Sequence, residues 1–158
     1  MLVAMTAGVP WVAGCAPRIE VEKVIKIADV HTGWYDAGIQ PDGKNKLVPS
    51  ISLRLQNVSE QPVTGVQLVA IFRQVNEPGV AWGEHFTRAI GPNGLAPAAS
   101  TSPIVLRSNL GYTGTQPRMQ MLQNREFVDA KVDIFARHGS RGLVKLGEST
   151  IDRQLLTQ

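Results

Sequence analysis

The chain has 158 residues, of which 43% are hydrophobic and 18% charged, which is enough for one globular domain with a modest core but too little for two. Its 16 basic and 13 acidic side chains leave a net charge of +3, so charge alone does not indicate a polyanionic partner. A single cysteine excludes an internal disulfide framework and an all-cysteine metal site. No apolar run approaches about 18 residues, which argues against a multi-span membrane protein.

The first fifteen residues, MLVAMTAGVPWVAGC, contain no charged side chain, and all 29 charged residues (16 + 13) lie beyond Cys15. An apolar stretch of this length suits the hydrophobic region of a secretory signal, although no Lys or Arg precedes it as a complete signal requires. The alternative is an apolar N-terminal segment of the fold in which Cys15 is an inert buried thiol.

The residues Val12-Ala13-Gly14-Cys15 resemble the lipobox of bacterial lipoproteins. The resemblance implies that residues 1–14 are removed as a signal peptide and that Cys15 becomes the acylated first residue of a 144-residue chain (158 − 14). Residues 15–18 would then form a lipidated tether and residues 19–158 the folded domain. Ala16 follows the cysteine, and the absence of an Asp there implies the outer membrane, with the domain facing the periplasm.

Apolar residues beyond the tether recur with period two, which predicts a mostly β domain. We expect a strand or bent pair of strands over Ile19–Val30, a long loop over His31–Leu47, and a half-buried strand where Ile51, Leu53 and Leu55 alternate with polar residues. The next strand, residues 66–72, is apolar at both parities and is therefore expected to be central and covered on both faces.

The remainder of the chain continues the pattern with one helical interruption. A weaker strand is expected over Val80–Ile90, another near residue 104, a short helix over Thr115–Asn124, and two strands joined by a turn at residues 138–142. About seven strands and one short helix predict a single immunoglobulin-like antiparallel β-sandwich.

Part of this order resembles a known group of secreted domains. The strand ending in Asn57-Val58-Ser59, the apolar strand after Pro62-Val63, and the turn Leu95-Ala96-Pro97 are similar to immunoglobulin-like domains of the FxLYD and water-stress type. The chain lacks the Phe-x-Leu-Tyr-Asp signature itself. The resemblance covers about a third of the chain and implies the fold and an envelope setting, not a reaction.

Residues that could support catalysis or bind a metal are dispersed along the sequence. His31, His85 and His138 show no metal-ligand spacing, and Asp129 and Asp133 lie ~13 Å apart along one strand at about 3.3 Å per residue, too far apart for two-carboxylate hydrolysis. Gly139-Ser140-Arg141-Gly142 lies in a hairpin turn rather than a nucleophile elbow. We therefore expect no enzyme activity, metal or cofactor, and an envelope hydrolase would need a His, a carboxylate and a nucleophile to converge by folding.

Charged and aromatic side chains are the remaining candidates for contact. A cationic surface toward an envelope polymer could form from basic residues of the C-terminal third, namely Arg107, Arg118, Arg125, Arg137, Arg141, Lys145 and Arg153. Interspersed acids dilute this charge, and nucleic acid is not an expected partner. The aromatic candidates for a partner surface are Trp34, Tyr35, Trp82, Phe86 and Tyr112. Either these rings fill the open ends of the sandwich, or they form a partner-binding edge.

These observations predict a non-catalytic, lipid-anchored envelope lipoprotein that binds another envelope protein or supports an assembly. The alternative is a periplasmic ligand- or glycan-binding lipoprotein, with the ligand held by the loops around Trp34 and Tyr112; a sizeable apolar cavity would favour it.

Overall fold

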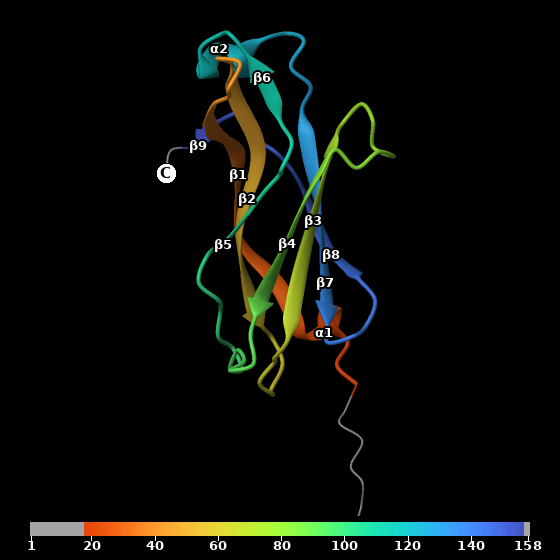
Figure 1. Ribbon diagram of the computed structural model, residues 1–158. Helices are drawn as coiled ribbons and strands as arrows, with labels where there is room; N and C mark the ends of the chain where they lie inside the picture. Colours follow the sequence, from red (N-terminus) through yellow and green to blue (C-terminus); the bar gives the residue numbers. More distant parts are fainter. Residues whose placement is uncertain (1–17, 157–158) are drawn as a thin grey trace, which may run out of the picture.

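The computed structural model describes residues 18–156, which form two β-sheets packed face to face and two short helices (Figure 1). The predicted signal segment 1–14 and the predicted lipidation site Cys15 lie outside the described residues. None of the helices within residues 18–156 is long and apolar enough to cross a membrane. The mostly β sandwich expected from the sequence is confirmed.

The first sheet has five strands. β2 lies between β1 on one side and both β5 and β6 on the other, and β9 pairs with the far edge of β1. The β1–β9 pair is parallel, whereas the other pairs in this sheet are antiparallel. The bounds are β1 Ile25–Ile39, β2 Asn45–Asn57, β5 Ile104–Arg107, β6 Tyr112–Gly114 and β9 Leu155–Leu156.

The second sheet has four antiparallel strands in the order β4-β3-β7-β8. Its bounds are β3 Val66–Gln74, β4 Gly83–Ile90, β7 Ala130–His138 and β8 Val144–Thr150. The predicted turn at residues 138–142 joins β7 to β8, as expected.

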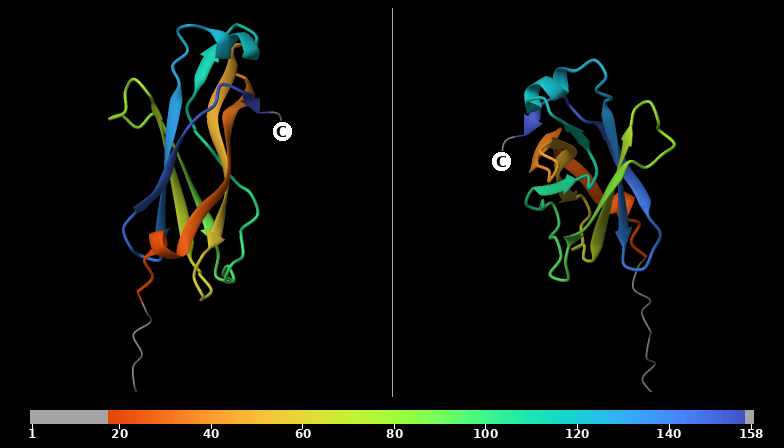
Figure 2. Two further views of the ribbon diagram at one scale, coloured as in Figure 1. Left: turned by 180° about the vertical axis from the view of Figure 1, so that it is seen from behind. Right: turned by 45° about the horizontal axis from the view of Figure 1, so that its top comes forward.

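The two helices lie at opposite ends of the sandwich (Figures 1 and 2). α1 (Val21–Val24) lies where the described chain begins, within a segment predicted to be a strand, and its Val21 is buried in the core. α2 (Arg118–Gln123) falls within the predicted helix 115–124 and begins directly after Pro117, whose fixed φ suits a helix start. It lies beside β6 at the end where the β1–β2 hairpin turns.

The core lies between the two sheets and follows the period-two pattern of the sequence. In β2 the side chains of Leu53 and Leu55 are fully buried, and in β3 those of Leu68, Ala70 and Phe72 are too. Because side chains alternate between the faces of a strand, these residues face the opposite sheet while Arg54, Val69 and Ile71 face outward and are only partly buried. β3 is central, as expected, because it lies between β4 and β7, but the expectation that it is covered on both faces is wrong.

The predicted long loop over His31–Leu47 is also wrong, because β1 continues through it to Ile39 and pairs with β2. Two interruptions of the β1–β2 register, at Ala28/His31 and at Asp36/Ile39, explain the missed strand. Each shift changes which parity faces the core, so strict alternation is lost. The short β6 and β9, which were not predicted as separate strands, bring the total among the described residues to nine instead of about seven.

Candidate functional site: the outer face of the four-stranded sheet

The structure places the five predicted aromatic site residues in different surroundings. Trp34 lies in β1 and is fully buried in the core rather than in a loop. Trp82, just before β4, and Tyr112, in β6, are partly buried and packed against the core. Tyr35 is partly buried under the guanidinium of Arg107, which lies 3.6 Å from its ring centroid. Only Phe86, in β4, is largely exposed, at 58%.

Four aromatic rings pack together inside one end of the sandwich. The ring centroid of Trp34 lies 6.2 Å from that of Trp82, 5.6 Å from that of Tyr112 and 4.6 Å from that of Phe127. Such tilted and edge-on pairs stabilise a fold beyond the area they bury. The rings of Trp34, Trp82 and Tyr112 therefore fill the end of the sandwich and do not form a partner-binding edge. Phe127, the fourth ring, was not predicted from the sequence.

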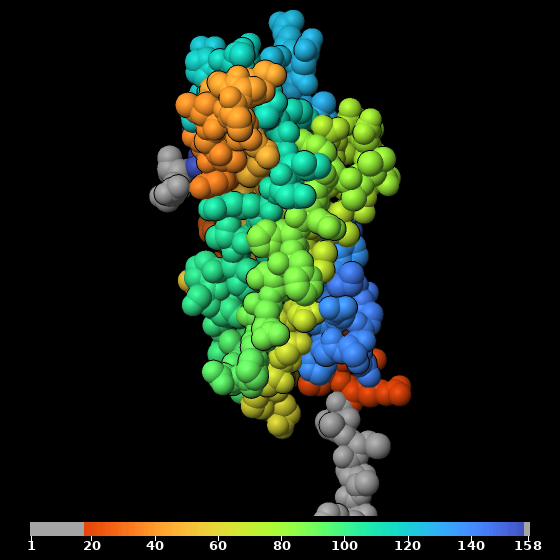
Figure 3. Space-filling view, viewed as in Figure 1, coloured from red at the N-terminus to blue at the C-terminus, as the bar shows by residue number. Residues whose placement is uncertain are grey.

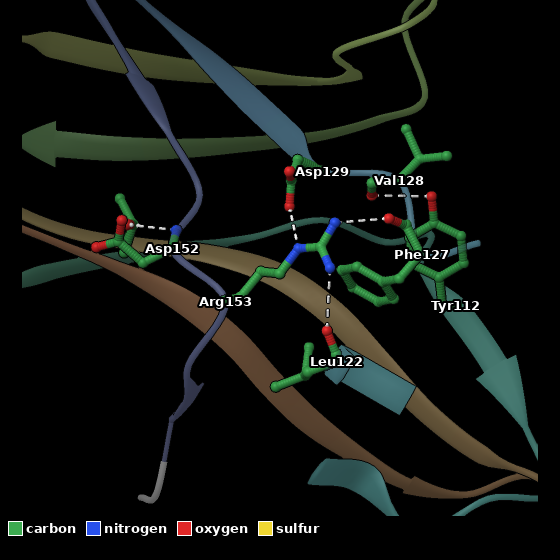
Figure 4. Close-up of polar contacts among 8 residues, drawn as sticks. Tyr112, Leu122, Phe127, Val128, Asp129, Asp152 and Arg153 are labelled. Carbon is green, nitrogen blue, oxygen red and sulfur yellow. Dashed lines mark hydrogen bonds and ion pairs between the residues drawn. The ribbon is translucent and has the colours of Figure 1, made fainter. Parts of the chain in front are cut away.

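Arg153 holds the segment that carries Phe127 (Figure 4). Its Nε donates to Asp129 Oδ1 at 2.6 Å, and its other nitrogens donate to the backbone carbonyls of Phe127 at 2.8 Å and Leu122 at 3.3 Å. The guanidinium also lies 5.2 Å from the Phe127 ring centroid. These contacts hold the chain between α2 and β7 over the aromatic rings. Arg153 and Asp129 therefore stabilise the fold.

Tyr112 is likewise held by structural contacts. Burial raises the pKa of its hydroxyl above the ordinary value. The hydroxyl donates to the carbonyl of Val128 at 3.0 Å. The same oxygen accepts from Gln74 Nε2 at 2.9 Å. A surface pocket of about 350 Å³ adjoins Tyr112, Met121 and Phe127, but most of its remaining lining is polar. It is not the apolar cavity that would favour the ligand-binding alternative.

Phe86 belongs to a row of apolar side chains on the outer face of the four-stranded sheet, the face turned away from the five-stranded sheet. Val69 is the register partner of Phe86 in β4 and also of Phe135 in β7. Directly paired side chains on one face lie about 5 Å apart at Cβ, so the three form a continuous row, here called the outer stripe. Val69 and Phe135 are partly buried and Phe86 is exposed.

One side of the outer stripe is bordered by a compact ion-pair network. Asp133, in β7, is 7% exposed and lies 3.1 Å from Arg73 Nε and 2.9 Å from Lys145 Nζ. Burial alone would raise the pKa of Asp133, but hydrogen bonds from Lys145 and Arg73 outweigh it and hold the pKa below its usual range. Lys145 also contacts Glu148 at 2.5 Å. The charges on this side are largely matched within the sheet.

The other side of the stripe is bordered by a row of polar residues two positions along each strand. Gln67 in β3 is the register partner of both Arg88 in β4 and Arg137 in β7. Arg137 donates through Nε and Nη2 to Gln67 Oε1, at 3.0 and 2.5 Å. Arg88 is exposed. Thus the outer face presents apolar rings next to two arginines.

The histidines and aspartates considered as catalytic or metal-binding candidates are spread over several strands and loops of the structure. Within residues 18–156, no group of three or more His, Cys, Asp or Glu side chains is placed to hold a metal. His31, His85 and His138 lie on three different strands, and Asp129 and Asp133 are engaged by Arg153, Arg73 and Lys145. An apolar row that carries one exposed aromatic ring and has polar borders is typical of a protein contact surface.

The loop between β3 and β4, residues 75–82, projects from the right side of the body as drawn (Figure 3). It exposes Val75 at 45% and Val80 at 59%, on a loop rather than on a paired surface. The outer stripe is instead supported by three hydrogen-bonded strands, which fix the spacing of its side chains.

No family model matches the chain, and no curated protein matches it. Solved structures that match include a target of the Northeast Structural Genomics Consortium, 13% identical, with a TM-score of 0.39 over 84% of this chain and 85% of that chain. Another is a protein from Archaeoglobus fulgidus, 17% identical, with a TM-score of 0.39 over 83% of this chain and all of that chain. Both are distant similarities in a two-sheet β fold, and they assign no family.

Proposed function

We propose that this protein is a non-catalytic, lipid-anchored envelope lipoprotein whose β-sandwich binds a protein partner or supports an assembly through the outer stripe. The observation that carries the partner surface is the exposed Phe86 in register with Val69 and Phe135 on a rigid sheet face. The lipobox-like residues that end at Cys15 support the anchor, and the resemblance to FxLYD and water-stress domains supports an envelope setting. Ala16 favours the outer membrane as its location.

The energetics of the stripe favour a macromolecular partner over a small ligand. The stripe lies on a sheet face and is not enclosed, so it cannot bury most of the surface of a small molecule. A partner that covers Phe86 removes apolar surface from water at about 25 cal/mol per Å². Exposed aromatic residues at the centre of such surfaces often carry a large share of binding energy.

We expect that replacing Phe86 with Ala removes the partner while the fold remains intact. First, a photo-crosslinking phenylalanine analogue at position 86 of the protein in native membranes should capture a discrete partner, which mass spectrometry identifies. Phe86→Ala should then lower co-purification of that partner at least tenfold, because an aromatic anchor at an interface contributes about 2 kcal/mol or more.

The matched control is Met119→Ala, which truncates a side chain of similar exposure, 51%, on α2 at the end of the sandwich. It should leave co-purification within about twofold of the unmodified protein, a change of about 0.4 kcal/mol. Equal loss in both variants, or none in Phe86→Ala, would contradict a partner surface at the outer stripe.

The membrane anchor has its own test at Cys15. Cys15→Ser should abolish incorporation of a fatty-acid probe and release the protein from the membrane fraction, because the hydroxyl cannot form the thioether and stable anchoring needs more than one acyl chain. Probe labelling and membrane fractionation measure the two effects. Unchanged labelling of the serine variant would refute acylation at this residue.

A further inference from the structure

We infer that the arginine row, defined as Arg88, Gln67 and Arg137, binds carboxylates of an acidic polypeptide segment that packs an apolar side chain on the outer stripe. The inference rests on the proposed function, since it names the chemistry of the partner that the stripe would bind. Three features of the outer face carry it: the geometry of the row, its unmatched charge and the open space beside it.

The geometry of the row follows from the strand register. Gln67 is paired with Arg88 on one side and Arg137 on the other, and neighbouring strands lie about 4.8 Å apart. The two arginines are thus separated by two strand spacings, ~10 Å at the backbone. Gln67 Oε1 accepts two hydrogen bonds from Arg137, which orients that guanidinium within the row.

The charge of the row is unmatched, in contrast to the other border of the stripe. Arg73 and Lys145 have Asp133 and Glu148 as ion-pair partners. No Asp or Glu of residues 18–156 forms an ion pair with Arg88 or Arg137. Arginine presents a planar set of donors that suits a carboxylate in two-point contact. An added carboxylate at this row would therefore meet positive charge that no group of the fold already neutralises.

Space for such a group is present beside the row. A surface hollow of about 500 Å³ is lined by Gln67 and Arg88 together with Gly65, Gly91, Pro92 and Gly139. Three of these residues are glycines without a side chain, which leaves the approach to Arg88 open. The stripe lies two residues farther along the same strands, ~6.7 Å away, which matches the distance between alternate side chains of an extended peptide.

The same face favours a polypeptide over an anionic membrane surface. Glu84 and Glu148 are exposed on the outer face near Phe86 and Lys145. Glu148 is paired with Lys145, but Glu84 has no ion-pair partner among the described residues. A bilayer with uniformly negative headgroups would be repelled by Glu84, whereas a peptide can place its acidic side chains at the arginine row alone.

The test uses the acylated protein in nanodiscs of zwitterionic phosphatidylcholine and two fluorescent peptides, acetyl-Glu-Glu-Ser-Phe-Ser-amide and the same peptide with Gln in place of both Glu. Fluorescence anisotropy should give at least tenfold tighter binding of the Glu peptide at low salt, which is about 1.4 kcal/mol. The preference should shrink as salt rises, because exposed charges are screened.

Protein variants separate the arginine row from the stripe. Arg88→Gln combined with Arg137→Gln should remove the preference for the Glu peptide, while Arg125→Gln, at an exposed arginine after α2, should leave the affinity within twofold. Phe86→Ala should weaken the binding of both peptides. Suppose that Phe86→Ala weakens peptide binding, but the unmodified protein binds the Glu and Gln peptides equally, or the double arginine variant still prefers the Glu peptide. The carboxylate inference is then wrong, while the partner surface at the outer stripe stands.

Three further outcomes would also overturn the inference. The first is no binding of the Glu peptide up to about 1 mM, the weakest affinity of interest at about −4 kcal/mol. The second is that the protein binds phosphatidylglycerol vesicles more tightly than the Glu peptide and that this binding depends on Arg88 and Arg137. The third is that the Phe86→Ala variant binds both peptides and captures the partner as well as the unmodified protein does. This outcome would contradict the proposed function as well.

Discussion

Replacing Leu55 with Asp is expected to unfold the sandwich at room temperature. Leu55 is fully buried in β2, opposite Ile27 of β1, and faces the second sheet. A carboxylate at this position cannot reach water, and an unpaired buried charge costs several kcal/mol of stability even after relaxation or protonation. Domains of this size are stable by only about 5–15 kcal/mol. Loss of the cooperative transition in a thermal melt followed by circular dichroism would register the effect.

Gln56→Asp is the matched control for this substitution. Gln56 is the next residue of β2, so it points to the opposite side of the sheet and is only partly buried. We expect its free energy of unfolding to change by about 0.5 kcal/mol or less, as is usual for surface positions. A melt of Leu55→Asp that matched the unmodified protein would show that Leu55 does not face the core.

The second large effect is expected at Trp34, where replacement by Ala should lower the free energy of unfolding by about 3–5 kcal/mol. The indole is fully buried and touches the rings of Trp82, Tyr112 and Phe127, so its removal leaves a cavity and ends three aromatic contacts. Urea denaturation, followed by circular dichroism, gives the difference in stability between the two proteins.

Trp34→Phe provides the informative comparison at the same site. The indole Nε1 is buried without a hydrogen-bond partner among the described residues. Such an unsatisfied donor costs about 1–3 kcal/mol, and phenylalanine removes that cost while retaining an aromatic ring. We therefore expect Trp34→Phe to lower the free energy of unfolding by less than half as much as Trp34→Ala does. Equal losses of stability in the two variants would contradict the cost assigned to the unpaired indole N–H.

The strands that could be predicted from the sequence are those with unbroken alternation. Leu53 and Leu55 in β2, the residues of β3, and Val132 and Ile134 in β7 keep one parity toward the core throughout. β1 could not be predicted in full, because its inward residues change from Ile25 and Ile27 to Thr32 and Trp34 after the register shift. A bulge depends on the pairing with a neighbouring strand, which local periodicity does not contain.

The candidate site could be predicted only in part for the same reason. Trp82 and Phe86 share one parity in the sequence, which left open whether their rings fill the end of the sandwich or form a partner-binding edge. In the structure Phe86 is exposed, whereas Trp82 packs against the core. Trp82 precedes the first residue of β4, so strand parity does not govern its direction. The outer stripe and the arginine row join β3, β4 and β7, and their alignment depends on a register between residues up to about 70 positions apart.

The pairing of β1 with β9 has a consequence for the order of folding. Gln154 Nε2 donates to the carbonyl of Thr32, 122 residues earlier, and the backbone N–H of Trp34 donates to the carbonyl of Gln154. The edge of β1 therefore stays unpaired until the segment about 120 residues later in the chain is available to fold against it. The irregular pairing between Ala28 and His31, where Asp29 has a positive φ of 50°, interrupts that edge. Such an interruption discourages the unpaired strand from joining a neighbouring chain during the delay.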